Sequence, residues 1–130
     1  MALEAAAGGE ICEPYAFRIA STPGSLREVD WRGMIEGLAQ DMSRGVPLPR
    51  IARAVHETLA AMIAETAAAC GGDTIVLSGG CFQNRLLTER AIARLRGLEK
   101  RVFINRRVPP GDGGLALGQA LWARRQAEAV

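Results

Sequence analysis

The sequence predicts an α/β domain with a small, mostly parallel sheet flanked by helices. Short apolar or alternating runs, which are typical of strands, stand between longer segments whose apolar residues recur at helical spacing. The expected order is strand, strand, helix, helix, strand, helix, strand, helix. Where helices separate the strands, crossover connections make those strands parallel.

Length and composition fit one domain, or one lobe of something larger. The chain has 130 residues, of which 48% are hydrophobic and 23% are charged. A net charge of +2 is too small to indicate a nucleic-acid partner, because such proteins carry a clustered basic face. The basic residues that do gather are expected to form a solvated face; they are Arg94, Arg96, Lys100, Arg101, Arg106 and Arg107.

The cysteines and the apolar runs indicate a cytoplasmic protein. Cys12, Cys70 and Cys81 are odd in number and form no C-x-x-C pair, as expected in a reducing compartment. Nothing resembles a signal peptide, and no apolar run is long enough to span a membrane. We therefore expect no membrane partner.

The first residues are typical of the end of a longer helix. Residues 1–7 are rich in alanine but have no capping residue before them, which suggests a piece of a longer protein. Residues 1–13 are thus interpreted as the tail of an upstream helix and a linker. Tyr15 to Ala20 alternates like a half-buried strand, a turn is expected at 21–25, and 27–29 is a second short strand.

Two helices are predicted next. Asp30 is a good N-cap for the first helix, and Gly45 ends it. Pro49 suits the first turn of the second helix, which runs to about Gly71. The apolar faces are formed by Trp31, Met34, Ile35, Leu38 and Met42 in the first helix and by Ile51, Val55, Leu59, Met62 and Ile63 in the second.

The second half of the chain alternates strands and helices. Thr74 to Leu77 is a β-branched and apolar run, which predicts a strand buried on both faces, and 101–105 predicts another strand. A helix is expected over 83–96 and a last one over 115–126. The residues expected to face inward are Leu86, Leu87, Ala91 and Leu95 in the former and Leu117, Ala120 and Leu121 in the latter.

Two glycine-rich loops, 78–81 and 111–114, each follow a strand and should face the same crevice. Gly79 and Gly80 have no Cβ, so a ligand could approach the main chain closely. Ligands of open α/β sheets bind beyond the carboxyl ends of strands, and free N–H groups at a helix start attract phosphate. The expected ligand is a nucleotide. The alternative is a simple structural turn.

Four segments carry a resemblance to a known family. They are D-W-R-G-M-I at 30–35, I-A-R-A-V-H-E-T-L-A at 51–60, L-S-G-G-C-F-Q-N-R-L-L at 77–87 and V-P-P-G-D-G-G-L-A-L-G-Q-A at 108–120. Together they resemble the carboxy-terminal end of the hydrogenase-maturation carbamoyltransferases, the HypF family, from about residue 14 onward. The resemblance implies that 14–130 is the second lobe of an actin-like ATPase (ribonuclease H-like) fold, whose first lobe is a missing partner.

The resemblance also implies roles for particular residues. Gly79, Gly80, Asn84 and Gly113 would bind the nucleotide, ATP or carbamoyl adenylate, and Asp112 would bind a divalent metal. An aspartate in a glycine-rich turn beside phosphates is a natural oxygen ligand for a cation. The alternative is that P-G-D-G is an ordinary turn in which the aspartate caps the next helix.

Three other residues are of types that often carry chemistry or cover an interface. His56, the single histidine, is expected to be a packed residue or to support the site from behind its ligands. Cys81 follows the glycines, but no neighbouring basic residue would activate its thiol, so it is interpreted as a small apolar filler. Trp31 is expected to be in the core or to cover a seam with preceding polypeptide. No catalytic residue is assigned.

The resemblance implies a function for the intact protein. The domain would bind carbamoyl adenylate and pass the carbamoyl group to the carboxy-terminal cysteine of a partner protein in the maturation of nickel–iron hydrogenase. The fragment alone is expected to be inactive, since half a site neither surrounds the phosphates nor excludes water. An exposed lobe surface should favour self-association. The alternatives are a tRNA threonylcarbamoyl-transferase-like enzyme and a non-catalytic interaction lobe.

Overall fold

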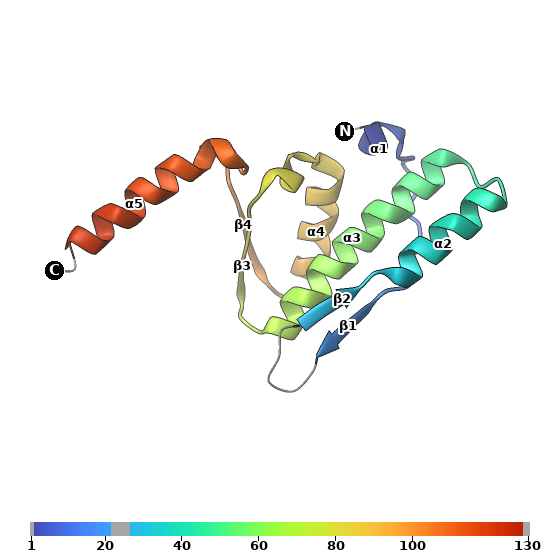
Figure 1. The fold of residues 1–130 in the computed structure, drawn as a ribbon, viewed down its shortest axis with the longest axis horizontal. Helices are drawn as coiled ribbons and strands as arrows, with labels where there is room; N and C mark the ends of the chain where they lie inside the picture. Colours follow the sequence, from blue (N-terminus) through green and yellow to red (C-terminus); the bar gives the residue numbers. More distant parts are fainter. Residues whose placement is uncertain (1, 22–26, 129–130) are drawn as a thin grey trace.

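The structure, a computed structural model, describes residues 2–21 and 27–128. It confirms the α/β class and the order of elements (Figure 1). The helices are α1 (Ala2–Ala6), α2 (Arg32–Ser43), α3 (Leu48–Cys70), α4 (Arg85–Gly97) and α5 (Leu115–Glu128), and the strands are β1 (Arg18–Ser21), β2 (Arg27–Asp30), β3 (Thr74–Leu77) and β4 (Arg101–Ile104). Short 3-10 helices span Gly80–Gln83 (η1) and Asp112–Gly114 (η2). The predicted turn falls mostly on 22–26, outside the described residues.

The strands form two separate ladders within the described residues. Strands β1 and β2 pair antiparallel, whereas β3 and β4 pair parallel with Thr74 opposite Arg101 and Leu77 opposite Ile104. The crossover through α4 therefore gives the predicted parallel pair. A single, mostly parallel sheet is not formed, because no hydrogen bond joins the hairpin to β3 in the described part of the chain.

Helix α3 is the centre of the molecule, and it lies beside α2 and α4 (Figure 1). Its small side chains allow close packing against α4, and leucines of β3 and α4 complete the core. The buried core cluster consists of Ala60, Ala64, Leu77, Leu87, Ala91 and Leu95. The long helix thus positions both β3 and the start of α4.

The helix ends largely follow the predicted signals. Gly45 and Gly71 follow α2 and α3 with positive φ, a conformation that suits glycine. The predicted N-cap of α2 is wrong by one residue: Trp31 occupies that position, because Asp30 still pairs in β2. The Asp30 carboxylate instead accepts the backbone N–H of Arg32 and pairs with its guanidinium at 2.7 Å. This guanidinium lowers the pKa of Asp30 to about 2.

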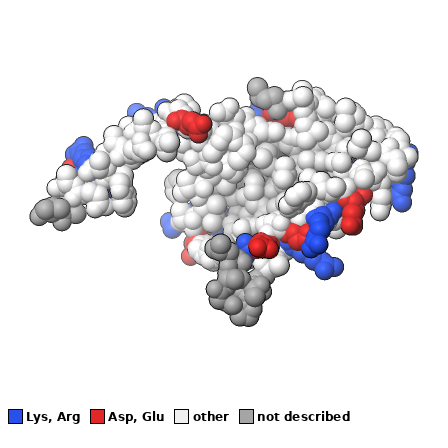
Figure 2. Space-filling view, viewed as in Figure 1, with Lys and Arg blue, Asp and Glu red and all other residues white. Residues whose placement is uncertain are grey.

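The predicted burial of β3 and of α5 is wrong. Strand β3 is not covered on both faces, because the side chain of Val76 is 64% exposed. Helix α5 has no buried residue, and Leu117, Ala120 and Leu121 are all exposed. Helix α5 projects away from the rest of the molecule (Figure 1). Figure 2 shows the concave surface between this helix and the body. Both exposed surfaces are apolar and so resemble surfaces that pack against another part of a protein.

Among residues 2–21 and 27–128, no helix is both long and apolar enough to cross a membrane.

Candidate functional site

The two glycine-rich loops meet in the structure, as the sequence predicts. The N–H of Gly79 donates a hydrogen bond to the carbonyl oxygen of Pro110 at 2.6 Å, and the Ser78 hydroxyl donates to the same oxygen at 3.3 Å. A Cβ atom on Gly111 would lie 3.5 Å from the Cα of Gly80. The main chains of the loops therefore lie against each other where β3 and β4 end.

A groove of about 760 Å³ lies between these loops and the first turns of α5. It is lined by main chain and polar groups of the loops on one side and by the α5 side chains Gln119 and Trp122 on the other. Trp122 is 67% exposed, so its ring offers a broad apolar surface to the groove. Sequence reasoning missed Gln119 and Trp122. A signal for Trp122 was present in the sequence: Gly118 and Trp122 are four residues apart, so they share one face of a helix, and both line the groove.

The glycines of the loops differ in whether backbone conformation or packing excludes a side chain at their positions. Gly79 has φ of +114°, which a residue with a side chain rarely adopts, and Gly114 is closed in because a Cβ there would lie 2.6 Å from the Pro109 carbonyl oxygen. Gly113 packs near the Pro109 ring. Gly80, in contrast, faces open space, where a Cβ would meet no atom within 4 Å. The chain's own packing therefore does not explain a glycine at position 80.

Asp112 lies in the groove, at the first position of η2, and is exposed. Asp112 does not cap η2, because Gly111 occupies the N-cap position of that helix. Within residues 2–21 and 27–128, no group of three or more histidine, cysteine, aspartate or glutamate side chains could hold a metal ion. Asp112 is therefore at most one ligand of a metal, and these residues do not form a complete metal centre.

Asn84 lies outside the groove and is the N-cap of α4. Its Oδ1 accepts the N–H of Leu87 at 2.9 Å, and its Nδ2 donates to Nε2 of His56 at 2.9 Å. On the other side of the ring, Nδ1 of His56 donates to the carbonyl oxygen of Ala52 at 2.7 Å. Because an amide nitrogen only donates and a carbonyl only accepts, His56 carries its proton on Nδ1.

His56 is therefore a packed residue that orients the cap of α4. It is only 2% exposed, and both ring nitrogens are used within the protein. The start of α4 is also closed to phosphate, contrary to expectation. The Glu4 carboxylate accepts the N–H groups of Arg85 and Leu86 at 2.7 and 3.1 Å, so those donors are not free.

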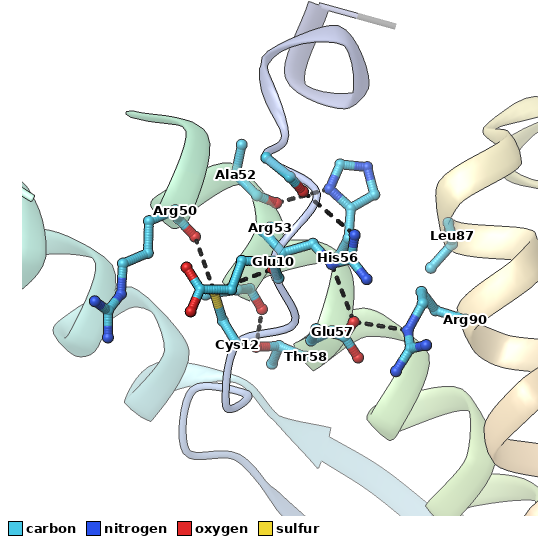
Figure 3. Close-up of polar contacts among 12 residues, drawn as sticks. Glu10, Cys12, Arg50, Ala52, Arg53, His56, Glu57, Thr58, Leu87 and Arg90 are labelled. Atoms are coloured by element: carbon cyan, nitrogen blue, oxygen red, sulfur yellow. Dashed lines mark hydrogen bonds and ion pairs between the residues drawn. The ribbon is translucent and has the colours of Figure 1, made fainter. Parts of the chain in front are cut away.

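A second buried polar cluster lies below the histidine (Figure 3). Glu57 is 0% exposed and is surrounded by three arginines. Its carboxylate oxygens lie 3.1 Å from Nε of Arg53, 2.7 Å from Nε of Arg90 and 3.1 Å from Nη2 of Arg94. Sequence reasoning missed this cluster, although Arg53–Glu57 and Arg90–Arg94 each show the four-residue spacing of one helix face.

Charge balance decides the ionisation of Glu57. Burial alone would raise the pKa of its carboxyl group, but the contacts with Arg90 and Arg94 outweigh burial and hold the pKa below its usual value. Arg53 also donates to the carbonyl oxygen of Gly8 at 3.3 Å and so fastens the chain after α1 to α3. The cluster joins α3, α4 and the first residues of the chain, and it lies apart from the glycine-rich groove.

The cysteines are free thiols. Cys81 is exposed, so its interpretation as an apolar filler is wrong. No thiol in the described residues lies among groups that could hold a metal.

Comparison with known proteins gives consistent similarities. A sequence profile described as carbamoyltransferase, Kae1-like domain, second subdomain, matches residues 1–119. A carbamoyltransferase HypF homologue of Cupriavidus necator is 38% identical over 110 residues, covering 78% of this chain and 27% of the relative. The carbamoyltransferase HypF of Synechocystis sp. is 31% identical over 121 residues, covering 93% of this chain and 16% of the relative.

A solved structure agrees with these similarities. A full-length HypF crystallised in a phosphate- and nucleotide-bound form superposes with a TM-score of 0.88 and 30% identity, covering 97% of this chain and 17% of that protein. The chain thus spans between about a sixth and a quarter of the length of these relatives.

Proposed function

Because the chain belongs to the HypF carbamoyltransferase family, as the second subdomain of a Kae1-like domain, we propose that it supplies half of a nucleotide site. The ligand is ATP or carbamoyl adenylate. In the longer polypeptide, the carboxy-terminal cysteine thiolate of a hydrogenase-maturation partner attacks the carbamoyl carbon of carbamoyl adenylate, so a C–S bond forms, the bond to the phosphate oxygen breaks and AMP leaves. The first lobe of the same domain is the other partner, and it closes the site.

The observation that carries this proposal is the meeting of the two glycine-rich loops. Gly79 and Asp112 line one groove, Gly80 lies against Gly111 of the groove lining and has no packing reason to be a glycine, and Gly113 sits in the second loop. A backbone without side chains allows phosphates or a ribose to approach the main chain, where N–H groups can donate to them. The nucleotide-bound form of a related HypF supports this choice of ligand.

Other side chains have smaller roles in the proposal. Asn84 contacts the nucleotide only through the amide hydrogen that it does not donate to His56, and His56 supports it from behind. Asp112 supplies one oxygen ligand to a divalent metal, whose remaining ligands come from phosphates and from polypeptide outside this chain. That metal would neutralise phosphate charge when bound. No residue of this chain is assigned to the covalent step.

Calorimetric titration with ATP and AMP, with and without Mg²⁺, tests the proposal. We expect weak binding by the chain, weakened about tenfold or more, ~1.4 kcal/mol, in Gly80→Val. Position 80 is suited to this test because a side chain there meets no atom of the protein and should leave the fold intact. Gly97→Val is a matched control, since position 97 is equally open but lies outside the groove.

The outcomes are distinct. Binding lost in Gly80→Val but kept in Gly97→Val supports a nucleotide site at the glycine loops. Binding that survives Gly80→Val places the nucleotide elsewhere. No heat from the folded chain favours a non-catalytic interaction lobe, a role that would fit the exposed apolar side of α5. The isolated chain should then self-associate through that surface.

A further inference from the structure

Strand β4 has one open edge. Strand β3 pairs with one side of β4, and within the described residues no strand pairs with the other side. The last three residues of the strand, Val102, Phe103 and Ile104, carry no charge, although natural proteins commonly place charges or proline on open edges. The unpaired N–H and C=O groups on this side of β4 are therefore suited to pair with an added strand.

A cleft of about 930 Å³ follows this edge. Its lining includes Val102, Phe103 and Ile104, whose side chains alternate between the two faces of the ladder, but no residue of β3. Its walls are α4, which contributes Ile92, and the apolar side of α5, which contributes Leu117. The cleft therefore lies along the unpaired side of β4 and is apolar along the strand.

Positive charge lies in this cleft where β4 stops. Arg106 and Arg107 follow the strand and line the cleft, and Arg96 lines it near the end of α4. All three are exposed, and in the part of the chain that the structure describes none of them pairs with a carboxylate. Glu89 is the single acidic residue of the lining, and it already pairs with Arg85 at 2.7 Å. The lining thus favours an anionic group beside Arg106 and Arg107.

The cleft adjoins the glycine-rich groove. Asn105, Gly114 and Gly118 line both of them. Both glycine-rich loops lie at the carboxyl end of the β3–β4 ladder. An extended segment that runs parallel to β4 would therefore end beside the groove.

We propose that the open edge of β4 is the docking site for the carboxy-terminal tail of the acceptor protein. This inference rests on the proposed function, which requires a carboxy-terminal cysteine to reach the nucleotide. The tail adds to β4 as a parallel strand, and its apolar side chains pack between α4 and α5. Arg106 and Arg107 bind its terminal carboxylate, so that the cysteine lies beside the glycine-rich groove.

The cleft fits a terminal tail better than a helix or an internal segment. A helix cannot pair with the open N–H and C=O groups of β4, because its own main-chain groups are already bonded within the helix. An internal segment has no main-chain carboxylate for Arg106 and Arg107. A chain end supplies this carboxylate, and chain ends are commonly free enough to enter a cleft.

Labelled peptides test the proposal on the full chain, by fluorescence anisotropy in reducing buffer without nucleotide. The probe has about ten residues, a length typical of a long strand, with a lysine at its start, alternating valine and threonine, and a cysteine with a free carboxylate at its end. Its carboxy-terminal amide is the matched control. We expect the amide to bind about tenfold more weakly or worse, because it loses the charge-assisted hydrogen bonds to arginine. Equal binding of acid and amide, or no binding of either, would overturn the proposal.

Backbone methylation tests the addition of a strand. Successive N–H groups of a strand point to opposite sides, so methylating alternate amides blocks either the side that pairs with β4 or the opposite side. We expect one of the two methylated peptides to lose binding and the other to keep it. Equal effects of both methylation patterns would contradict pairing with a single edge.

Substitutions in the chain test the carboxylate site. Arg106→Gln with Arg107→Gln should weaken binding of the acid peptide to the level of the amide and leave the amide unchanged. Arg124→Gln with Arg125→Gln is the matched control, because it removes the same charge from α5 outside the cleft. Equal losses in the two double variants would mean unspecific charge attraction and would overturn the assigned site.

Titration of the same chain with ATP separates this inference from the proposed function. A chain that binds ATP but not the peptide contradicts the docking site alone. A chain that binds the acid peptide through Arg106 and Arg107 but does not bind ATP supports the docking site and contradicts the nucleotide groove.

Discussion

Glu57 is the residue on which the packing of α3 against α4 depends most directly. Three arginines surround its carboxylate, which is fully buried. Removing one partner of such a cluster leaves buried charges uncompensated, which costs more than the cluster itself contributes.

The first prediction concerns this carboxylate. Glu57→Gln should lower the free energy of unfolding by about 3–5 kcal/mol, because Arg53, Arg90 and Arg94 lose their counter-charge. Glu89→Gln is the matched control. Its ion pair with Arg85 is exposed and should be worth less than about 0.5 kcal/mol. Urea unfolding measures both values, and similar losses in the two variants would contradict the assigned importance of Glu57.

The same group predicts a pH dependence. Since the pKa of Glu57 is lowered in the folded protein, its stabilisation is present above the ordinary glutamate pKa of about 4.3 and is lost as pH falls below it. Part of the acid-side loss of stability should therefore disappear in Glu57→Gln. An unchanged acid slope in the variant would show that other carboxyl groups cause it.

At the scale of elements, the polar groups at the start of α4 already have hydrogen-bond partners within the chain. Asn84 caps the helix through Oδ1 and binds His56 through Nδ2, while Glu4 reaches across from α1 to the next two N–H groups. The free N–H groups at the start of α4 are thus satisfied by side chains of this chain and not by a ligand.

The two functions of the Asn84 amide can be separated. Asn84→Ala should lower the free energy of unfolding by about 1 kcal/mol through loss of the cap. Asn84→Asp keeps the capping oxygen but replaces the donor to His56 by a second acceptor; because the cap is expected to contribute most, this variant should lose less. Thermal or urea unfolding distinguishes them. Equal losses would mean that the contact with His56, and not the cap, is the important one.

Local signals predicted the elements well. Gly45 and Gly71 follow the ends of their helices, and Pro49 lies in a first turn. These residues can be interpreted from sequence because they act on the backbone conformation of a few neighbouring residues only. Pairing and burial were harder to predict. Val76 and Leu121 are residue types that are usually buried, yet they are exposed at 64% and 54%, because no described part of the chain packs over them.

The candidate site could be predicted only in part, because some of its contacts follow from strand pairing and others depend on distant positions. The two glycine loops were predicted to meet, and they do, since the carboxyl ends of paired parallel strands lie at one edge. The occupation of the α4 start by Glu4 could not be predicted, because it depends on a contact between positions about eighty residues apart.

At the scale of the whole molecule, the described residues form an α3–α4 core with open surfaces around it. They include the glycine groove, an apolar groove between β2, α3 and β3, and helix α5, which projects from the body (Figure 1). Such surfaces are typical of a part that is completed by neighbouring polypeptide. This agrees with a family whose members are several times longer than this chain.

The proposed nucleotide site requires that the two glycine-rich loops, 78–81 and 111–114, bind one nucleotide together. Amide chemical-shift mapping by NMR, during titration of the chain with ATP, tests it most directly. We expect joint shifts at Gly79, Gly80, Gly111 and Gly113, with little change at Arg85, whose N–H donates to the Glu4 carboxylate. Shifts confined to the start of α4, or a folded chain whose loop amides do not respond, would contradict it.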